Sequence, residues 1–204
     1  MPKPPSSPKS PQSVLKANIH SANAVNLSLA SLAEPLTRAA KLMADCLLNG
    51  HKLLTCGNGG SASDGAHIAT EFVARFVDNR RSYPAICLAD SASALTAIGN
   101  DFGFDQVFAR QVHSFAQKGD VLIAITTSGK SKNVTLALEA AKEVGIASIA
   151  LLGKGGGQAR GIATVDLLVA SEVTARVQEA HLLLYHCLCE WVDDELMAKE
   201  AQEV

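Results

Sequence analysis

The sequence predicts an α/β fold in which helices cover both faces of a parallel sheet. Short apolar runs, the strongest being VLIAITT at 121–127, alternate along the chain with longer segments whose apolar residues recur at helical spacing. Strands joined through helices form right-handed crossovers, and such crossovers place the strands parallel to one another. With 204 residues, of which 48% are hydrophobic, the chain is long enough for one domain with a substantial core.

The N-terminal segment is expected to contain a tail followed by two helices. Five of the seven prolines lie within residues 1–11, mixed with Ser and Lys, so we expect 1–11 to be a disordered tail and 12–204 to form the single domain. Apolar residues at helical spacing predict a helix over 12–32. A second helix, with Pro35 in its first turn, ends at Leu48 before an Asn-Gly pair. These two helices predict an N-terminal helical hairpin.

The alternating part of the fold follows. Its apolar runs predict strands at 52–56, 85–88, 121–127, 147–152 and 165–170. The segments between them predict helices at 61–76, 92–98, 106–115 and 133–144, and a last helix follows at 174–197. The last helix is apolar nearly all round, which is typical of a helix buried on every side. In a chain of this size, we expect a partner subunit to cover it.

Charge and cysteine usage restrict the functional class. The 18 basic and 20 acidic residues nearly balance, which gives no electrostatic case for binding nucleic acid or an anionic membrane. No apolar run approaches the roughly 20 residues that span a bilayer, and the start MPKPPSSPKSP lacks the apolar core of a secretory signal. The five cysteines are scattered without a C-x-x-C pair, as in a reducing compartment. We therefore expect a cytoplasmic protein.

Two loops that follow predicted strands have the chemistry of a phosphate site. GNGGS (57–61) follows the first strand, and TTSGKS (126–131) follows the third. Glycines let the backbone approach an anion, helix N-termini offer free N–H groups, and hydroxyls donate further hydrogen bonds. Ser and Gly are also ordinary turn residues, so one such loop alone would be weak evidence. Two of them at the carboxyl ends of parallel strands favour a phosphorylated small molecule.

The nucleotide-binding motifs that these loops approach are incomplete. The second loop contains GKS, like the end of a P-loop, but Ala124 stands where that motif requires its first glycine. The first loop satisfies the relaxed dinucleotide pattern, but Asp78 precedes the second strand and Asp90 lies too far beyond it. Both nucleotide interpretations are therefore the weaker ones.

Histidines and acidic residues indicate a metal or proton-transfer site. His67 and Glu71 lie four residues apart and so share one helix face. The last helix carries Gln178, His181 and His186 in an otherwise apolar pattern, and burying such groups unpaired is expensive. These residue types suit a divalent metal or an acid–base pair. The structural alternatives are a solvated Glu beside a partly buried His, and a hydrogen-bond network at a subunit interface.

Four segments of the chain are GNGGSASDGAHIATEFVARF, LTAIGNDFGFDQVFARQV, GDVLIAITTSGKSKN and TARVQEAHLLLYH. In order and spacing they resemble the phosphoheptose isomerases, which belong to the sugar isomerase (SIS) domain family, and the resemblance covers about residues 12–197. It implies a flavodoxin-like three-layer α/β sandwich with a central parallel sheet, the SIS fold. It also implies an aldose–ketose isomerase that converts D-sedoheptulose 7-phosphate to D-glycero-D-manno-heptose 7-phosphate, the first step of ADP- or GDP-heptose precursor synthesis. A homotetramer with active sites at subunit interfaces, and one Zn²⁺ per subunit, are implied as well.

The resemblance also assigns roles to individual residues. The zinc ligands it implies are His67, Glu71, Gln178 and His186, and of these Glu71 would be the catalytic base and His186 the acid. The substrate-binding residues it implies are Asn58, Gly59, Gly60, Ser61, Glu71, Asn100, Asp101, Thr126, Thr127, Ser128, Ser131 and Gln178.

The sequence departs from the phosphoheptose isomerase pattern in the second loop, and spacing on the last helix allows a second histidine. The second loop has Thr126 where the family often has Ser, and Lys130 and Lys132 where it often has Asn and Pro; a nearby cation should help an anionic substrate. Gln178 and His186 are separated by about 12 Å along a helix axis, so His181 is the easier local partner of Gln178 on geometry alone.

Two other functions compete with this one. A non-catalytic SIS-domain binding protein, of the DnaA initiator-associating type that regulates replication, shares the fold. That branch lacks the acidic and histidine positions that correspond here to Glu71 and His186, and their retention favours an enzyme. An SIS isomerase of another sugar phosphate is the third interpretation, because the phosphate loops do not read the length of the sugar.

Overall fold

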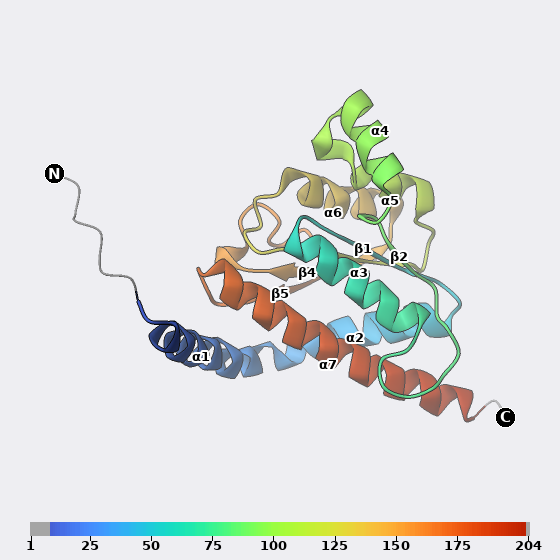
Figure 1. Ribbon diagram of the computed structural model, residues 1–204. Coiled ribbons are helices and arrows are strands. Elements are labelled where there is room, and N and C mark those ends of the chain that lie inside the picture. The colour runs from blue at the N-terminus through green and yellow to red at the C-terminus, as the bar shows by residue number, and fades with distance from the viewer. Residues whose placement is uncertain (1–8, 203–204) are drawn as a thin grey trace.

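The computed structural model describes residues 9–202 and contains one five-stranded parallel sheet with the strand order β2-β1-β3-β4-β5 (Figure 1). Every neighbouring pair of strands is parallel, which confirms the predicted α/β architecture. The strands are β1 Leu53–Gly57, β2 Ala85–Cys87, β3 Val121–Thr126, β4 Ala147–Leu152 and β5 Val165–Leu168.

The helices occupy the positions expected between these strands. They are α1 Pro11–Ser28, α2 Ala33–Leu48, α3 Gly60–Val73, α4 Ala92–Phe102, α5 Ala109–Phe115, α6 Lys132–Val144 and α7 Thr174–Glu200, with short 3-10 turns η1 Leu29–Leu32, η2 Phe104–Gln106 and η3 Lys154–Gly156. The largest differences from the predicted bounds are near Gly103, which ends α4 with a φ of 86°. Because the chain turns there, α4 extends to Phe102 and α5 starts only at Ala109.

Helices cover both faces of the sheet and make three layers. On one face, α2, α3 and α7 bury a cluster that includes Leu53, Ile123 and Ile149 of the strands. On the other face, α5 and α6 bury a second cluster with Leu54 and Leu122. Successive strand residues therefore enter different cores, which explains why the strands are continuous apolar runs rather than alternating ones. Figure 1 shows α2, α3 and α7 on one side of the sheet and α5 and α6 on the other.

The N-terminal helices differ in arrangement from the expected hairpin. Residues 1–8 of the expected tail lie outside the described residues, and α1 begins at Pro11 with Ser10 as its N-cap. From α1 the chain continues through η1, whose flanking residues keep helical angles, directly into α2. The two helices follow one another along α7 instead of folding back on each other (Figure 1). Arg176 of α7 holds α1 in place by donating to the Asn18 carbonyl at 3.1 Å.

An apolar surface is left open on α1 and α7. No residue of α1 is buried, although Val14, Leu15 and Ile19 are large and hydrophobic. On α7, Leu182 and Leu183 are exposed on the side away from the sheet. The last helix is therefore covered on its inner side only, and its coverage by a partner subunit stays a prediction.

Candidate active site

Three of the predicted metal ligands converge between α3 and α7. His67 and Glu71 lie on successive turns of α3, and His186 reaches them from α7, so that one donor atom from each lies within 4.8 Å of the others. His67 Nε2 is 2.7 Å from Glu71 Oε1, and the rings of His67 and His186 have centroids 5.2 Å apart, edge to face. The His67 side chain is 42% exposed and that of Glu71 16%. The group is therefore open to a small ligand.

The chemistry of this group suits a divalent metal. Two imidazole nitrogens and one carboxylate oxygen are typical zinc donors. Burial lowers the pKa of His186, and the neighbouring His67 lowers it further, while Glu71 acts in the opposite direction. A lowered pKa favours the neutral imidazole, which is the form that binds a metal. His67, Glu71 and His186 thus fit a metal centre.

Gln178 of α7, the fourth predicted ligand, reaches the start of α3. A Cβ atom at Gly60 would meet Gln178 Nε2, so the Gln178 amide lies directly against the first turn of α3. Gln178 thereby contacts the first glycine loop. Its role as a metal ligand stays a prediction.

His181 faces a different part of the molecule. The side chain is fully buried, and its Nε2 lies 3.1 Å from the carbonyl oxygen of Leu152, at the end of β4. Burial lowers the pKa of His181 to about 4, although the hydrogen bond to Leu152 works against this. The ring is therefore neutral at physiological pH, and its Nε2 is engaged by the carbonyl oxygen of Leu152 in β4. Of the two histidines that spacing alone allowed, the fold brings His186 to His67 and Glu71.

The two predicted phosphate loops lie side by side. Gly57 pairs with Ile125 in the sheet, so the loops after β1 and β3 leave the same edge. The amides of Asn58 and Asn133 exchange two hydrogen bonds of 2.9 Å and join the first loop to α6. Asn133 was not identified from the sequence; the signal available was a polar residue buried in the first turn of the helix that follows the second loop.

The second loop is held by its own hydroxyl groups and by a third loop. Thr126 Oγ1 accepts from the Gly129 amide at 3.2 Å and contacts Ser131 Oγ at 3.3 Å. The Lys130 amide donates to Ser128 Oγ at 3.2 Å. Gly129 has a φ of 62°, and a Cβ atom there would overlap the carbonyl of Gly156 in the third glycine-rich loop. That third loop therefore supports the second one. The remaining predicted residues of the two loops, Gly59, Ser61 and Thr127, lie at the same edge of the sheet.

Asn100 and Asp101 are placed apart from these groups. Both lie on α4, a helix with no buried residue, and Asn100 Nδ2 donates to Asp101 Oδ1 at 2.8 Å. Within residues 9–202 neither forms a side-chain hydrogen bond with the two loops. Their predicted contact with substrate stays a prediction.

Comparisons with known proteins identify the family of the chain. The family model of the SIS domain matches residues 19–153. A phosphoheptose isomerase of Aliarcobacter butzleri is 48% identical over 166 residues, which cover 81% of this chain and 88% of that protein. The chain belongs to the phosphoheptose isomerase family. It is accordingly an enzyme, an isomerase, as the retained Glu71 and His186 predicted.

Solved phosphoheptose isomerase structures have the same fold. The structure from Francisella tularensis matches with a TM-score of 0.87 and 35% identity, and the one from Neisseria gonorrhoeae with 0.84 and 41%. Each comparison covers 91% of this chain and 100% of the other chain. The predicted SIS fold is thus confirmed. Among the residues described, no helix has the length and apolar character needed to cross a membrane.

One departure from the phosphoheptose isomerase pattern acquires a structural explanation. Lys132 Nζ lies 3.0 Å from Asp105 Oδ2, in an ion pair in which both side chains are exposed. Lys132 is therefore directed towards η2 by a local partner, and Lys130 is the exposed cation that stays within the second loop.

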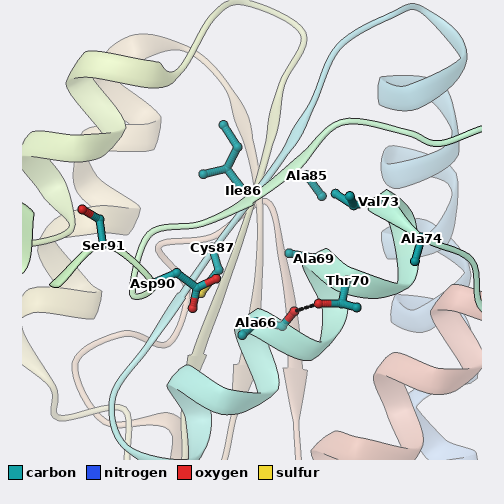
Figure 2. A pocket seen from close by; sticks show the side chains of 10 residues that line it. All are labelled: Ala66, Ala69, Thr70, Val73, Ala74, Ala85, Ile86, Cys87, Asp90 and Ser91. Carbon is teal, nitrogen blue, oxygen red and sulfur yellow. Dashed lines mark hydrogen bonds between the residues drawn. The ribbon is translucent and has the colours of Figure 1, made fainter.

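A groove of about 510 Å³ adjoins the site but is distinct from it (Figure 2). It runs between α3 and the edge strand β2, and its lining of small and apolar side chains includes Ala66, Ala69 and Val73. Figure 2 shows Thr70 on its wall, where Thr70 Oγ1 donates to the carbonyl of Ala66 at 2.9 Å. His67, Glu71 and His186 do not line this groove.

Arg80 fixes the far end of α3 against α7. Its side chain is 1% exposed, and its Nε donates to Asp193 Oδ1 at 2.7 Å. Its Nη2 donates to the carbonyl of Glu71 at 2.8 Å, and its Nη1 to the carbonyl of Phe72 at 3.1 Å. Because these carbonyls belong to the last turn of α3, one buried guanidinium both caps that helix and ties it to the helix that carries His186.

Replacing Arg80 is expected to destabilise the protein strongly. Arg80→Ala leaves the Asp193 carboxylate buried without its partner, which should lower the free energy of unfolding by about 3–5 kcal/mol. Arg81→Ala is the matched control, because the Arg81–Glu200 pair has an arginine side chain that is 61% exposed and should contribute little. Urea unfolding followed by circular dichroism measures both. Equal stability of the two variants would contradict this account.

Proposed function

We propose that this chain converts D-sedoheptulose 7-phosphate to D-glycero-D-manno-heptose 7-phosphate, the first step of ADP- or GDP-heptose precursor synthesis. The observation that carries the proposal is the convergence of His67, Glu71 and His186 from two helices. Two relatives that are 48% and 47% identical to this chain are phosphoheptose isomerases.

The phosphate of the substrate binds at the two glycine loops. The amides at the N-termini of α3 and α6 attract an anion, and the hydroxyls of Ser61, Thr126, Ser128 and Ser131 donate to its oxygens. Burial of Ser61 and Thr126 limits competition from water for these hydrogen bonds. Thr127 and the amides of Asn58, Gly59 and Gly60 complete this end of the site, and Asn100 and Asp101 complete the sugar end.

Glu71 and His186 move the proton between two carbons of the sugar. Glu71 removes a proton from C1 of the ketose while the C2 carbonyl oxygen takes up a proton, which gives an enediol. His186 then delivers a proton to C2 as the C1 hydroxyl gives up its proton and becomes the aldehyde oxygen. The Glu71 carboxylate is mostly shielded from water, and His186 lies beside it in the same group.

A zinc ion, one per subunit, would be held by His67, Glu71 and His186, with Gln178 as the fourth ligand. When bound, the metal polarises the substrate carbonyl and stabilises the negative charge that develops on its oxygen. A carboxylate that binds a metal is a weaker base, so Glu71 would act as the base only while it is not a ligand of the ion.

The competing functions fit less well. A non-catalytic binding protein of the DnaA initiator-associating type would not need Glu71 and His186 side by side. An isomerase of a different sugar phosphate would use the same loops and the same proton transfer, and a panel of sugar phosphates of different length separates it from the proposed reaction.

Glu71→Gln is expected to lower kcat by about 10²–10⁴-fold, since the amide cannot accept the proton. The assay is conversion of sedoheptulose 7-phosphate, with zinc content measured on the same samples. Glu143→Gln is the control, because Glu143 lies on the surface beside His113 with its side chain 69% exposed, and it should keep full activity. A Glu71→Gln enzyme within threefold of the wild type would rule out Glu71 as the base.

The subunits assemble as a homotetramer in the cytoplasm with active sites at subunit interfaces. The support is the exposure of large apolar side chains on two helices that contact each other, Val14, Leu15 and Ile19 of α1 and Leu182 and Leu183 of α7. Uncovered patches of this kind mark association surfaces. The five free cysteines agree with a reducing compartment.

Charge placed in this surface should break the assembly. The double substitution Leu182→Glu with Leu183→Glu is expected to shift the tetramer to smaller species in light scattering after size-exclusion chromatography, because carboxylates would then be buried without partners. Val77→Glu is the control, as Val77 is 63% exposed in the segment after α3. A monomeric wild type, or a tetramer unaffected by the double substitution, would contradict the proposed interface.

A further inference from the structure

Tyr185 is buried beside the proposed metal site and takes no part in the proposed reaction. It precedes His186 on α7 and is 1% exposed. Its hydroxyl lies 3.0 Å from Nδ1 of His67, the ring nitrogen on the opposite side from Glu71. The same hydroxyl donates to Asp64 Oδ1 at 3.5 Å, and Asp64 lies one turn before His67 on α3. The three side chains therefore form a chain of hydrogen bonds that ends at a proposed metal ligand.

The direction of these hydrogen bonds follows from the number of protons. A phenol has one proton to donate, whereas an ionised carboxylate can only accept. Once the hydroxyl of Tyr185 donates to Asp64, its oxygen must accept from His67, and the proton of the imidazole then resides on Nδ1. The ordinary pKa of a phenol, about 10, keeps this proton in place at neutral pH.

This arrangement prepares the other nitrogen for a metal. With the proton on Nδ1, Nε2 and the Glu71 carboxylate oxygen 2.7 Å away are both acceptors, so this close contact requires a cation, a proton or a metal ion, between them. Histidines that bind metals commonly donate their second N–H to a fixed acceptor, and this contact sets both the tautomer and the orientation of the ring. Here the acceptor is a tyrosine held by a carboxylate.

We propose that Asp64 and Tyr185 are positioning residues, which hold His67 as its Nδ1–H tautomer so that Nε2 can bind the metal. The proposal rests on the proposed metal centre at His67, Glu71 and His186. It concerns the affinity of that centre and assigns Tyr185 no contact with the substrate.

Tyr185→Phe tests this role while keeping the aromatic ring. It is expected to weaken zinc binding about 10–100-fold, measured by competition with a chromogenic chelator on the metal-stripped protein. Tyr83→Phe is a matched control, because its hydroxyl also donates to a carboxylate, Glu200 Oε1 at 2.6 Å, but has no link to His67. The control should bind zinc as the wild type does, even if its thermal stability falls.

Asp64→Ala provides a second test, which stays informative even if the Tyr185→Phe protein does not fold. Without its acceptor, the hydroxyl of Tyr185 is free to donate to Nδ1 and impose the wrong tautomer, so zinc affinity should fall in this variant too. In the Tyr185→Phe background the same substitution should have a much smaller effect, because both act through one hydroxyl.

These experiments separate the positioning role of Asp64 and Tyr185 from the metal centre itself. If the wild type binds no zinc, both the metal centre and the positioning role are wrong. If the wild type binds zinc and the folded Tyr185→Phe variant binds it within twofold of the wild-type affinity, or if Asp64→Ala has an equal effect in both backgrounds, only the positioning role is wrong.

Discussion

The pairing of α3 with α7 is the constraint on which the site depends. Each helix supplies part of the group formed by His67, Glu71 and His186, so the group exists only while the two are correctly spaced. At one end, Gly60 allows Gln178 to approach the first turn of α3. At the other end, Arg80 joins the last turn of α3 to Asp193 of α7. Between these two points lie His67, Glu71 and His186.

The sheet supplies the second half of the site. Because β1 and β3 are parallel neighbours, their loops leave the same edge, where the N-termini of α3 and α6 also point. One helix, α3, therefore begins in the first glycine loop and carries His67 and Glu71 on its second and third turns.

Much of the fold could be predicted because buried parallel strands are continuous apolar runs, and β4 was predicted with its observed bounds. The path of α1 and α2 could not, because helical periodicity does not say whether two successive helices fold back. On α7, spacing alone favoured His181 as the partner of Gln178 and the resemblance favoured His186, and only packing shows the ring of His181 bound to Leu152. Tyr185 and Arg80 were missed for a related reason. An aromatic in an apolar helix is usually core, and an arginine in an irregular segment is usually exposed, so their hydrogen bonds appear only in three dimensions.

The most direct test of the central claim is conversion of sedoheptulose 7-phosphate by the purified protein before chelation, after chelation and after zinc is restored. The account predicts formation of the aldoheptose phosphate, its loss on removal of the metal, and its recovery when about one zinc ion per chain has bound. Conversion that is unchanged by complete removal of metal, or its absence from the folded, zinc-loaded protein, would contradict the account.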